Sequence, residues 1–293
     1  MTEPTASPGG KALIWDMLKA QQPDLTAAER RLAATLLDDS LVAGLQSITK
    51  LAELAQVSTA TVVRLARKLG FDGFSDFQNT IREEVAARVK QPLAKLETSA
   101  MEAHSDHIIS RFALAVSRNI NATIDRLDVQ EFEEATNLLS DPKRHIYLMG
   151  GRITRSNAIY FYNHLQIIRP GVSMLDASPS VWPQSLLDID ASATLVVFDI
   201  RRYEKQLERL AKLVVEQGGN IVLFTDQWGS PIEAHARHCF RSMVEAPSSW
   251  DSTLAINFLI EALVAGIQAR SSSTDRIAAL EKMIGASRIF RGA

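Results

Sequence analysis

The sequence predicts a two-domain protein: a small all-α helix-turn-helix domain, followed by a doubly wound α/β domain with a five-stranded parallel sheet. Up to about residue 91, apolar side chains recur at the spacing of amphipathic helices. From about residue 129, near-continuous apolar runs alternate with helical segments, which is typical of strands buried on both faces of a parallel sheet. The chain of 293 residues is long enough to give each domain its own core.

We expect four segments along the chain. Residues 1–11 are rich in Pro, Gly, Ser and Thr and should form a disordered tail. Residues 12–91 should form the helix-turn-helix domain, 92–128 a mixed-charge helical connector, and 129–285 the α/β domain. An apolar stripe on the connector predicts either a dimer contact or docking onto the second domain.

Composition limits the possible functions. The net charge of −2 excludes a generally basic nucleic-acid coat, so any DNA contact must be a local patch. The single cysteine, Cys239, excludes an internal disulfide and fits a reducing compartment. The N-terminus lacks the features of a signal peptide, and no uncharged apolar run has the length of a membrane span. We therefore expect a cytoplasmic protein with no membrane partner.

The sequence predicts no metal site and no cofactor. His104 and His107 lie at i, i+3 spacing, but no cluster of Cys, Asp or Glu completes a ligand set. His235, His238 and Cys239 cross a helix-to-strand junction, so their side chains should diverge.

In the first domain, the stretch ITKLAELAQVSTATVVRLARKLG, residues 48–70, predicts two short helices joined by a tight turn. Ser58 should cap the start of the second helix, and Gly70 should end it in a left-handed conformation. The second helix should face the core with residues at i, i+3, i+4 and i+7 spacing: Val62, Leu65, Ala66 and Leu69.

The outer face of this second helix has the side chains that DNA recognition needs. The predicted DNA contacts are Ser58, Thr59, Ala60, Thr61, Val63, Arg64, Arg67 and Lys68. The first residues of a recognition helix meet base edges, and Arg64 could form a bidentate pair with guanine. Phosphates, which fix register without reading sequence, suit Thr59, Thr61, Arg67 and Lys68. The alternative is an ordinary helical hairpin with a solvated basic edge.

Further helices should pack behind this pair, because two helices alone cannot bury a core. Thr26 and Glu29 form a capping box that opens one of them. Phe71, Phe74 and Phe77 recur at i+3 after the second helix. We interpret this aromatic stripe as part of the core and not as a base-stacking surface.

The second domain has three strong strand signals and two weaker ones. The predicted strands are 145–149, 171–175, 194–200, 220–226 and 238–243. The helical segments that join them are 151–168, 179–188 and 203–217. A long apolar helix should follow at residues 250–270.

The residues LAELAQVSTATVVRLARKLGFDGFSDF resemble the DNA-binding half of the MurR/RpiR-type bacterial transcriptional regulators. The second half resembles a sugar isomerase (SIS) domain, the usual effector module of these regulators. In SIS domains a G-x-G-x-S turn after the first strand helps to hold a phosphosugar. The matching run here is Gly150, Gly151, Arg152, Ile153 and Thr154, in which Arg152 replaces the second glycine.

A second phosphate motif of the family, S-x-S-G-x-T, follows the third strand. This chain has Asp199-Ile-Arg201-Arg202-Tyr203-Glu204 there, so both serines, the glycine and the threonine are replaced. The arginines fall at the carboxyl ends of adjacent strands, where open α/β sheets bind ligands. They suit a carboxylate or phosphate. The predicted effector-binding residues are Gly150, Gly151, Arg152, Thr154, Arg155, Asp199, Arg201, Arg202, Tyr203, Ser248 and Ser249.

Both parts of this pocket have a structural alternative. Asp199 and Glu204 could pair with the arginines, which would leave the pocket closed or purely structural. Ser248 and Ser249 could present donors to the same crevice or simply cap the long final helix.

The leading interpretation is a DNA-binding transcriptional regulator, not an enzyme, whose SIS domain senses a small anionic carbohydrate derivative or organic acid. We expect a homodimer or homotetramer on double-stranded DNA with a palindromic operator. One alternative is a SIS-type sugar-phosphate isomerase with an accessory DNA-binding domain, although the phosphate motifs are missing. The other is a regulator whose SIS domain serves only as a dimerisation scaffold.

Overall fold

A computed structural model describes residues 13–38, 41–89, 107–270 and 275–287. These fall into two compact units, 13–89 and 107–287, which we describe separately. The expected tail at 1–11 and the connector as far as residue 106 lie outside the described residues.

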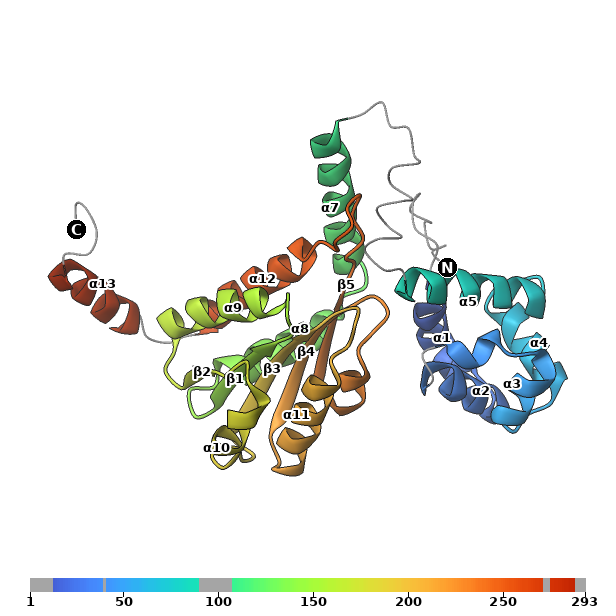
Figure 1. The fold of residues 1–293 in the computed structure, drawn as a ribbon, viewed down its shortest axis with the longest axis horizontal. Coiled ribbons are helices and arrows are strands. Elements are labelled where there is room, and N and C mark those ends of the chain that lie inside the picture. The colour runs from blue at the N-terminus through green and yellow to red at the C-terminus, as the bar shows by residue number, and fades with distance from the viewer. Residues whose placement is uncertain (1–12, 39–40, 90–106, 271–274, 288–293) are drawn as a thin grey trace. The chain divides into compact units, whose positions relative to one another are not determined.

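The first unit is helical throughout. Its elements are α1 (Ile14–Gln21), η1 (Gln22–Asp24), α2 (Ala27–Asp38), η2 (Val42–Leu45), α3 (Ile48–Leu54), α4 (Thr59–Lys68) and α5 (Phe74–Val89) (Figure 1). The predicted capping box is confirmed: Thr26 N donates to Glu29 Oε2 at 2.9 Å, and Glu29 N donates to Thr26 Oγ1 at 3.3 Å. These two bonds satisfy donors that the first turn of α2 would otherwise leave unpaired.

The predicted helix-turn-helix is formed by α3 and α4. Ser58 lies before α4 in extended conformation, and its Oγ accepts from Thr61 N at 3.2 Å. Gly70 has φ +90°, the left-handed conformation expected after a helix end. The four residues predicted to face the core are all buried: Val62, Leu65, Ala66 and Leu69.

The aromatic stripe is core, as predicted. Phe77 and Ile81 of α5 are fully buried, and the Phe71 and Phe77 rings lie 5.2 Å apart between centroids. Phe71 and Phe74 are partly buried against the same cluster. The stripe therefore holds α5 against α4 and offers no surface for base stacking.

The second unit contains a five-stranded parallel sheet with helices on both faces. Its helices are α7 (Ile108–Ile124), α8 (Val129–Ser140), α9 (Arg155–Ile168), η3 (Pro179–Val181), α10 (Trp182–Leu186), α11 (Lys205–Glu216), η4 (Pro231–His235), α12 (Leu254–Arg270) and α13 (Asp275–Ser287). Its strands are β1 (His145–Gly150), β2 (Val172–Met174), β3 (Ala193–Asp199), β4 (Asn220–Asp226) and β5 (His238–Ser242). All five lie at predicted positions, in the spatial order β2-β1-β3-β4-β5.

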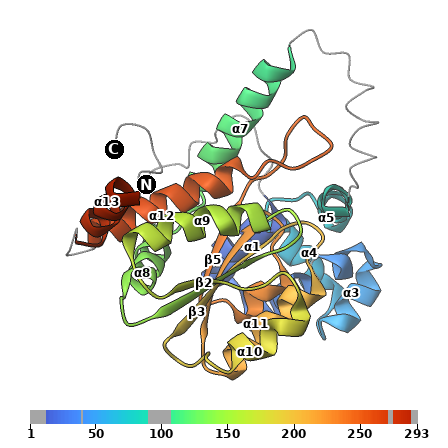
Figure 2. The ribbon, with the colours of Figure 1, turned by 60° about the vertical axis from the view of Figure 1, so that its left-hand side comes forward.

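Helices cover both faces of the sheet (Figure 2), and a separate hydrophobic core lies on each face. Alternate residues of β1, β3 and β4 pack on one side against α8, α9 and α12, with Phe198 and Phe224 stacked at 4.5 Å between ring centroids. The other residues of the same strands pack against α10 and α11. The near-continuous apolar runs of the sequence follow from this burial on both faces.

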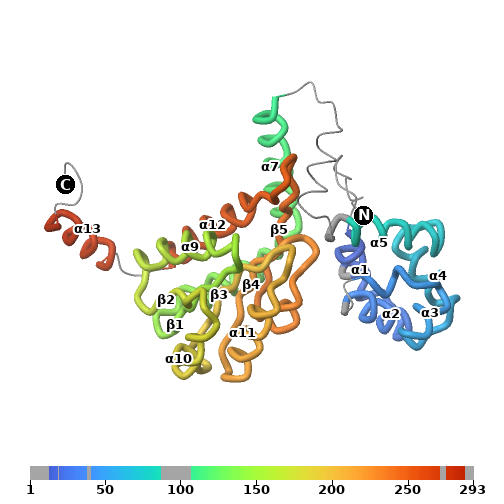
Figure 3. Tube along the Cα trace, viewed as in Figure 1, coloured from blue at the N-terminus to red at the C-terminus, as the bar shows by residue number. Residues whose placement is uncertain are grey.

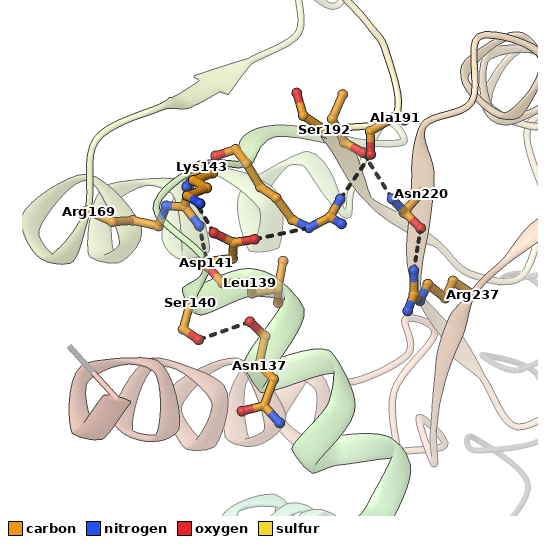
Figure 4. A network of polar contacts seen from close by, with 12 residues as sticks. Asn137, Leu139, Ser140, Asp141, Lys143, Arg169, Ala191, Ser192, Asn220 and Arg237 are labelled. Atoms are coloured by element: carbon orange, nitrogen blue, oxygen red, sulfur yellow. Dashed lines mark hydrogen bonds and ion pairs between the residues drawn. The ribbon is translucent and has the colours of Figure 1, made fainter. Parts of the chain in front are cut away.

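Hydrogen bonds close the amino edge of the sheet (Figure 4). Arg169 is 4% exposed, and its guanidinium donates to the carbonyl oxygens of Leu139 and Arg144. Burial lowers the pKa of Arg169 below its usual range. Arg144 in turn donates to Ala191 O at 3.1 Å. The carboxyl edge, where strand order reverses between β1 and β3, is the edge at which such sheets bind ligands.

Helix α7 docks on the second unit through its C-terminal half. It packs against α12 and β5. Met243 N donates to Thr123 Oγ1 at 3.0 Å, and Asn119 Nδ2 donates to Glu245 O at 2.8 Å. Towards its start, Ile109 remains 71% exposed.

No single helix among those described is long and apolar enough to cross a membrane. Helices α12 and α13 reach that length only as a pair, across a break at which they bend by 108°. Helix α12 runs beside α9 along the sheet (Figure 3). Many of its apolar side chains belong to the core of the sheet.

Candidate DNA-binding face and sheet-edge site

The outward face of α4 carries most of the predicted DNA contacts. Thr59, Ala60, Arg64 and Arg67 are exposed, and Val63 is partly exposed. These side chains come from the first two and a half turns of the helix, where a recognition helix meets base edges. The position of Ser58 before the helix makes it a cap, because its hydroxyl already accepts from Thr61 N.

Thr61 does not point outward as expected. It is 4% exposed, and its hydroxyl lies 3.0 Å from Ser58 Oγ. Arg64 Nη2 donates to the same oxygen at 3.1 Å. Helical periodicity places position 61 at the border of the buried face, and its side chain turns inward because Ser58 and Arg64 both supply partners. Thr61 therefore orients Arg64 within the helix.

Lys68 extends towards the start of α2. Its Nζ donates to Asp24 O at 2.6 Å and lies 3.1 Å from Glu29 Oε2. Glu29 is 5% exposed. The pKa of Glu29 is lowered, chiefly by the hydrogen bond from Thr26 N and further by Lys68. The ammonium of Lys68 therefore serves an internal contact.

The turn between β1 and α9 is closed by its own side chains. Thr154 is 3% exposed; its Oγ1 accepts from Gly151 N at 2.9 Å and donates to Phe198 O at 2.7 Å. A Cβ on Gly150 would lie 2.5 Å from Thr154 O, so this position has no room for a side chain. Gly150 and Thr154 thus shape the turn and join β1 to β3.

Glu204, the residue before α11, places its carboxylate against the backbone of the same turn. Its Oε1 accepts from Arg152 N at 2.8 Å. A Cβ on Gly151 would lie 2.6 Å from this oxygen, which shows how closely the carboxylate approaches the backbone. A side-chain carboxylate therefore takes a backbone donor to which an anionic ligand could otherwise bind.

Arg201 contacts three carboxylates, two through its guanidinium and one through its backbone N–H. Its Nε donates to Asp251 Oδ2 at 2.6 Å and its Nη2 to Asp251 Oδ1 at 2.9 Å, a bidentate pair. Glu245 Oε1 lies 3.9 Å from Nη2, and the guanidinium lies 3.9 Å from the centroid of the Trp228 ring. The backbone of Arg201 has φ +62°, and its N–H donates to Asp226 Oδ2 at 2.6 Å.

Two buried carboxylates underlie this loop. Burial raises the pKa of Asp199 to about 6, although Ser230 Oγ donates to it at 2.5 Å. Burial also raises the pKa of Asp226. Tyr203 Oη donates to Asp226 Oδ1 at 2.7 Å. Asp199, Tyr203 and Asp226 therefore fix the β3–α11 loop. The Arg201 guanidinium pairs with Asp251 and Glu245, and not with Asp199 or Glu204 as the structural alternative expected.

The other predicted effector residues differ in their accessibility. Arg155 Nη1 donates to Leu175 O at 3.3 Å. Arg152 and Arg202 are exposed, and within the described part of the chain their guanidinium groups have no hydrogen bond or ion pair. Ser248 Oγ accepts from Trp250 N at 3.2 Å, and Ser249 is half-buried. Ser252, not Ser248, accepts from Leu254 N at the start of α12.

Sequence reasoning did not single out Asp226, Trp228 or Glu245. Asp226 had a detectable signal, because it ends a buried strand at the same edge as Asp199. The other two depend on contacts across 27 or more positions of the chain, which no local pattern reveals. Among the described residues, no group of three His, Cys, Asp or Glu side chains could hold a metal ion. His104 lies outside them.

Comparisons with known proteins match both units. Residues 13–88 match the helix-turn-helix domain, rpiR family, and residues 138–266 match the SIS domain. An uncharacterized HTH-type transcriptional regulator of Haemophilus influenzae is 27% identical over 213 residues, 72% of this chain and 73% of the relative.

Two solved structures share the fold. The Vibrio vulnificus NanR protein complexed with ManNAc-6P has a TM-score of 0.55 and 17% identity, and the match covers 94% of this chain and 99% of that one. The sugar isomerase domain of an RpiR transcription factor from Sphaerobacter thermophilus has a TM-score of 0.56 and 16% identity, with 62% and 99% covered.

Proposed function

We propose that this chain, which belongs to the rpiR-type helix-turn-helix transcriptional regulators with a C-terminal SIS domain, binds operator DNA through α4 and responds to a small anionic metabolite. The capped helix α4, with its exposed outer face, is the observation that supports DNA binding. Arg64 is oriented by Thr61, while Thr59, Ala60, Val63 and Arg67 surround it. We place the working protein in the cytoplasm, where DNA is accessible.

Two copies should act together on DNA. A single helix-turn-helix contributes few base contacts, and proteins of this type reach specificity by pairing half-sites roughly 34–36 Å apart or a multiple of that distance. A homodimer, or a homotetramer built from it, would therefore recognise a palindromic operator.

The effector site lies at the carboxyl edge between β1 and β3. Arg152 and Arg202 supply the accessible positive charge there, whereas Arg201 is already paired with Asp251. A carbohydrate derivative with a phosphate or carboxylate fits this arrangement. The structural neighbour that was solved with ManNAc-6P supports a ligand of this class.

The two alternatives are less well supported. An isomerase would need a positioned acid or base beside a bound sugar phosphate. At this edge the buried carboxylates of Asp199 and Asp226 already accept hydrogen bonds from Ser230, Tyr203 and backbone donors. Glu261 of α12, another candidate base, accepts from Tyr160 Oη at 2.7 Å. A scaffold without a ligand would leave DNA affinity unaffected by any metabolite.

The test uses the full chain and an operator selected from random duplexes. DNA affinity is measured with and without a panel of sugar phosphates and organic acids, and isomerase turnover is assayed separately. We expect one compound to change DNA affinity in wild type and to lose its effect in Arg152→Ala and Arg202→Ala, but not in Arg209→Ala, an exposed control on α11. Turnover without any effect on DNA would favour the isomerase, and no response of either kind would favour the scaffold.

A further inference from the structure

The 243–253 segment joins β5 to α12 and contacts both the sheet-edge site and α7. Its two ends are linked by a backbone hydrogen bond from Ser252 N to Val244 O at 2.8 Å. Val244 is fully buried, and its N–H donates to Gln227 Oε1 at 3.0 Å. The segment is therefore an ordered loop that can transmit a displacement from one of its contacts to another.

Arg201 fixes this segment at the sheet edge. The bidentate pair with Asp251 joins side chains that are only 11% and 13% exposed, and Glu245 of the same segment adds a second carboxylate at 3.9 Å. Ion pairs shielded from water are stronger than surface pairs, and removal of one partner leaves a costly uncompensated charge. Asp251 can therefore leave Arg201 only when another anion, such as one bound first by the neighbouring Arg202, takes its place.

Helix α7 holds the same segment on its other side. Thr123, which is 1% exposed, accepts from Met243 N at 3.0 Å, and Asn119 Nδ2 donates to Glu245 O at 2.8 Å. Glu245 therefore contacts Arg201 through its carboxylate and α7 through its carbonyl. In chain order α7 is the first described element after the helix-turn-helix unit.

We propose that the 243–253 segment is the mechanical link between the effector site and α7. An anionic ligand that exchanges with Asp251 on Arg201 releases the segment, and the change reaches α7 through Thr123 and Asn119. This inference rests on the proposed function, because it assigns the route by which an effector would act on the DNA-binding unit. The two arrangements of Arg201, paired with Asp251 or with a ligand, form the two-state element that such coupling requires.

The first test needs no ligand. Amide hydrogen exchange is compared by mass spectrometry in the full-length wild type, Asp251→Asn and Glu208→Gln. Glu208 pairs with Lys212 on α11 and provides a charge-matched control. We expect Asp251→Asn to accelerate exchange roughly tenfold in both 243–253 and 108–124, with Glu208→Gln unchanged. Acceleration confined to 243–253, with α7 unaffected, would overturn the link.

A second test distinguishes ligand binding from the transmission of its effect through α7. Thr123→Val keeps the size of the side chain and removes the acceptor for Met243 N. With the active compound from the panel, this variant should keep the thermal shift of wild type and lose most of the change in DNA affinity, typically about 5–150-fold in allosteric regulators. An undiminished DNA response in Thr123→Val would overturn the proposed route and leave the sensing function intact. If wild type shows a thermal shift but no DNA response, the sensing function fails instead, while the exchange experiment still decides whether the segment and α7 are coupled.

Discussion

Lys68 Nζ lies 3.1 Å from Glu29 Oε2, so the last turn of the recognition helix is attached to the first turn of α2. The contact joins residues 39 positions apart and includes a second bond to Asp24 O. It places Lys68 among the groups that position α4. Arg67 beside it is likewise exposed but forms no ion pair among the described residues.

We therefore predict different salt dependences for Lys68→Ala and Arg67→Ala. Each phosphate contact contributes close to one unit to the slope of log K against log salt concentration. Arg67→Ala should reduce the magnitude of the slope by about one. Lys68→Ala should weaken binding and lower the Tm without a change in slope. Binding titrations at several salt concentrations measure this. A slope lowered equally by both variants would mean that Lys68 also contacts a phosphate.

Arg64 should read one base. Arg64→Ala is expected to cost about 1–3 kcal/mol of binding free energy and to relax the preference at a single operator position. Thr61→Val should have a smaller effect in the same direction, because it removes the acceptor that orients the guanidinium. Selection of binding sites with each variant would show this, and an unchanged consensus with Arg64→Ala would exclude base reading by this residue.

Glu204 should oppose anionic ligands. Its carboxylate accepts from Arg152 N, so an anion that enters the turn meets a like charge. Glu204→Gln keeps an acceptor and removes the charge, and we expect the active compound to bind roughly tenfold more tightly, which corresponds to about 1.4 kcal/mol. Calorimetric titration provides the measurement, with Glu208→Gln as control. Equal affinities in all three proteins would mean that the ligand stays away from the turn.

The sequence predicts the fold well for a physical reason. Strands β1, β3 and β4 are buried on both faces, so their apolar runs are unbroken, whereas the half-buried β2 and β5 give weaker signals. The caps Thr26, Ser58 and Gly70 depend only on neighbouring residues. Thr61 was wrongly expected to face outward. It lies at the border of the buried face, where the hydrogen-bond partners of its hydroxyl decide its orientation. Arg201 and Asp251 lie 50 residues apart, and only the folded chain reveals that they pair.

Stability should depend on pH through Glu84. Burial raises the pKa of Glu84 from its ordinary value of 4.5 to about 7, against the opposing effect of the 2.7 Å hydrogen bond from Ile14 N. Because the folded state binds the proton more tightly, this contribution to stability is complete below about 4.5 and is lost as the pH rises through about 7. Glu84→Gln cannot ionise and keeps an acceptor.

The Tm of Glu84→Gln should therefore match that of wild type near the ordinary pKa of 4.5 and exceed it above the raised pKa of about 7. The expected gain is on the order of 1–3 kcal/mol. Thermal unfolding over that pH range measures it, and a constant difference between the two proteins at every pH would contradict the assignment.

Occupation of the sheet edge should alter DNA binding by α4. The most direct measurement is the affinity of the full-length protein for its selected operator, titrated with the active compound in wild type, Arg202→Ala and Thr123→Val. We predict a shift in wild type that is lost in Arg202→Ala together with ligand binding, and lost in Thr123→Val while ligand binding remains. A wild-type affinity that no anionic carbohydrate derivative or organic acid changes would contradict the account.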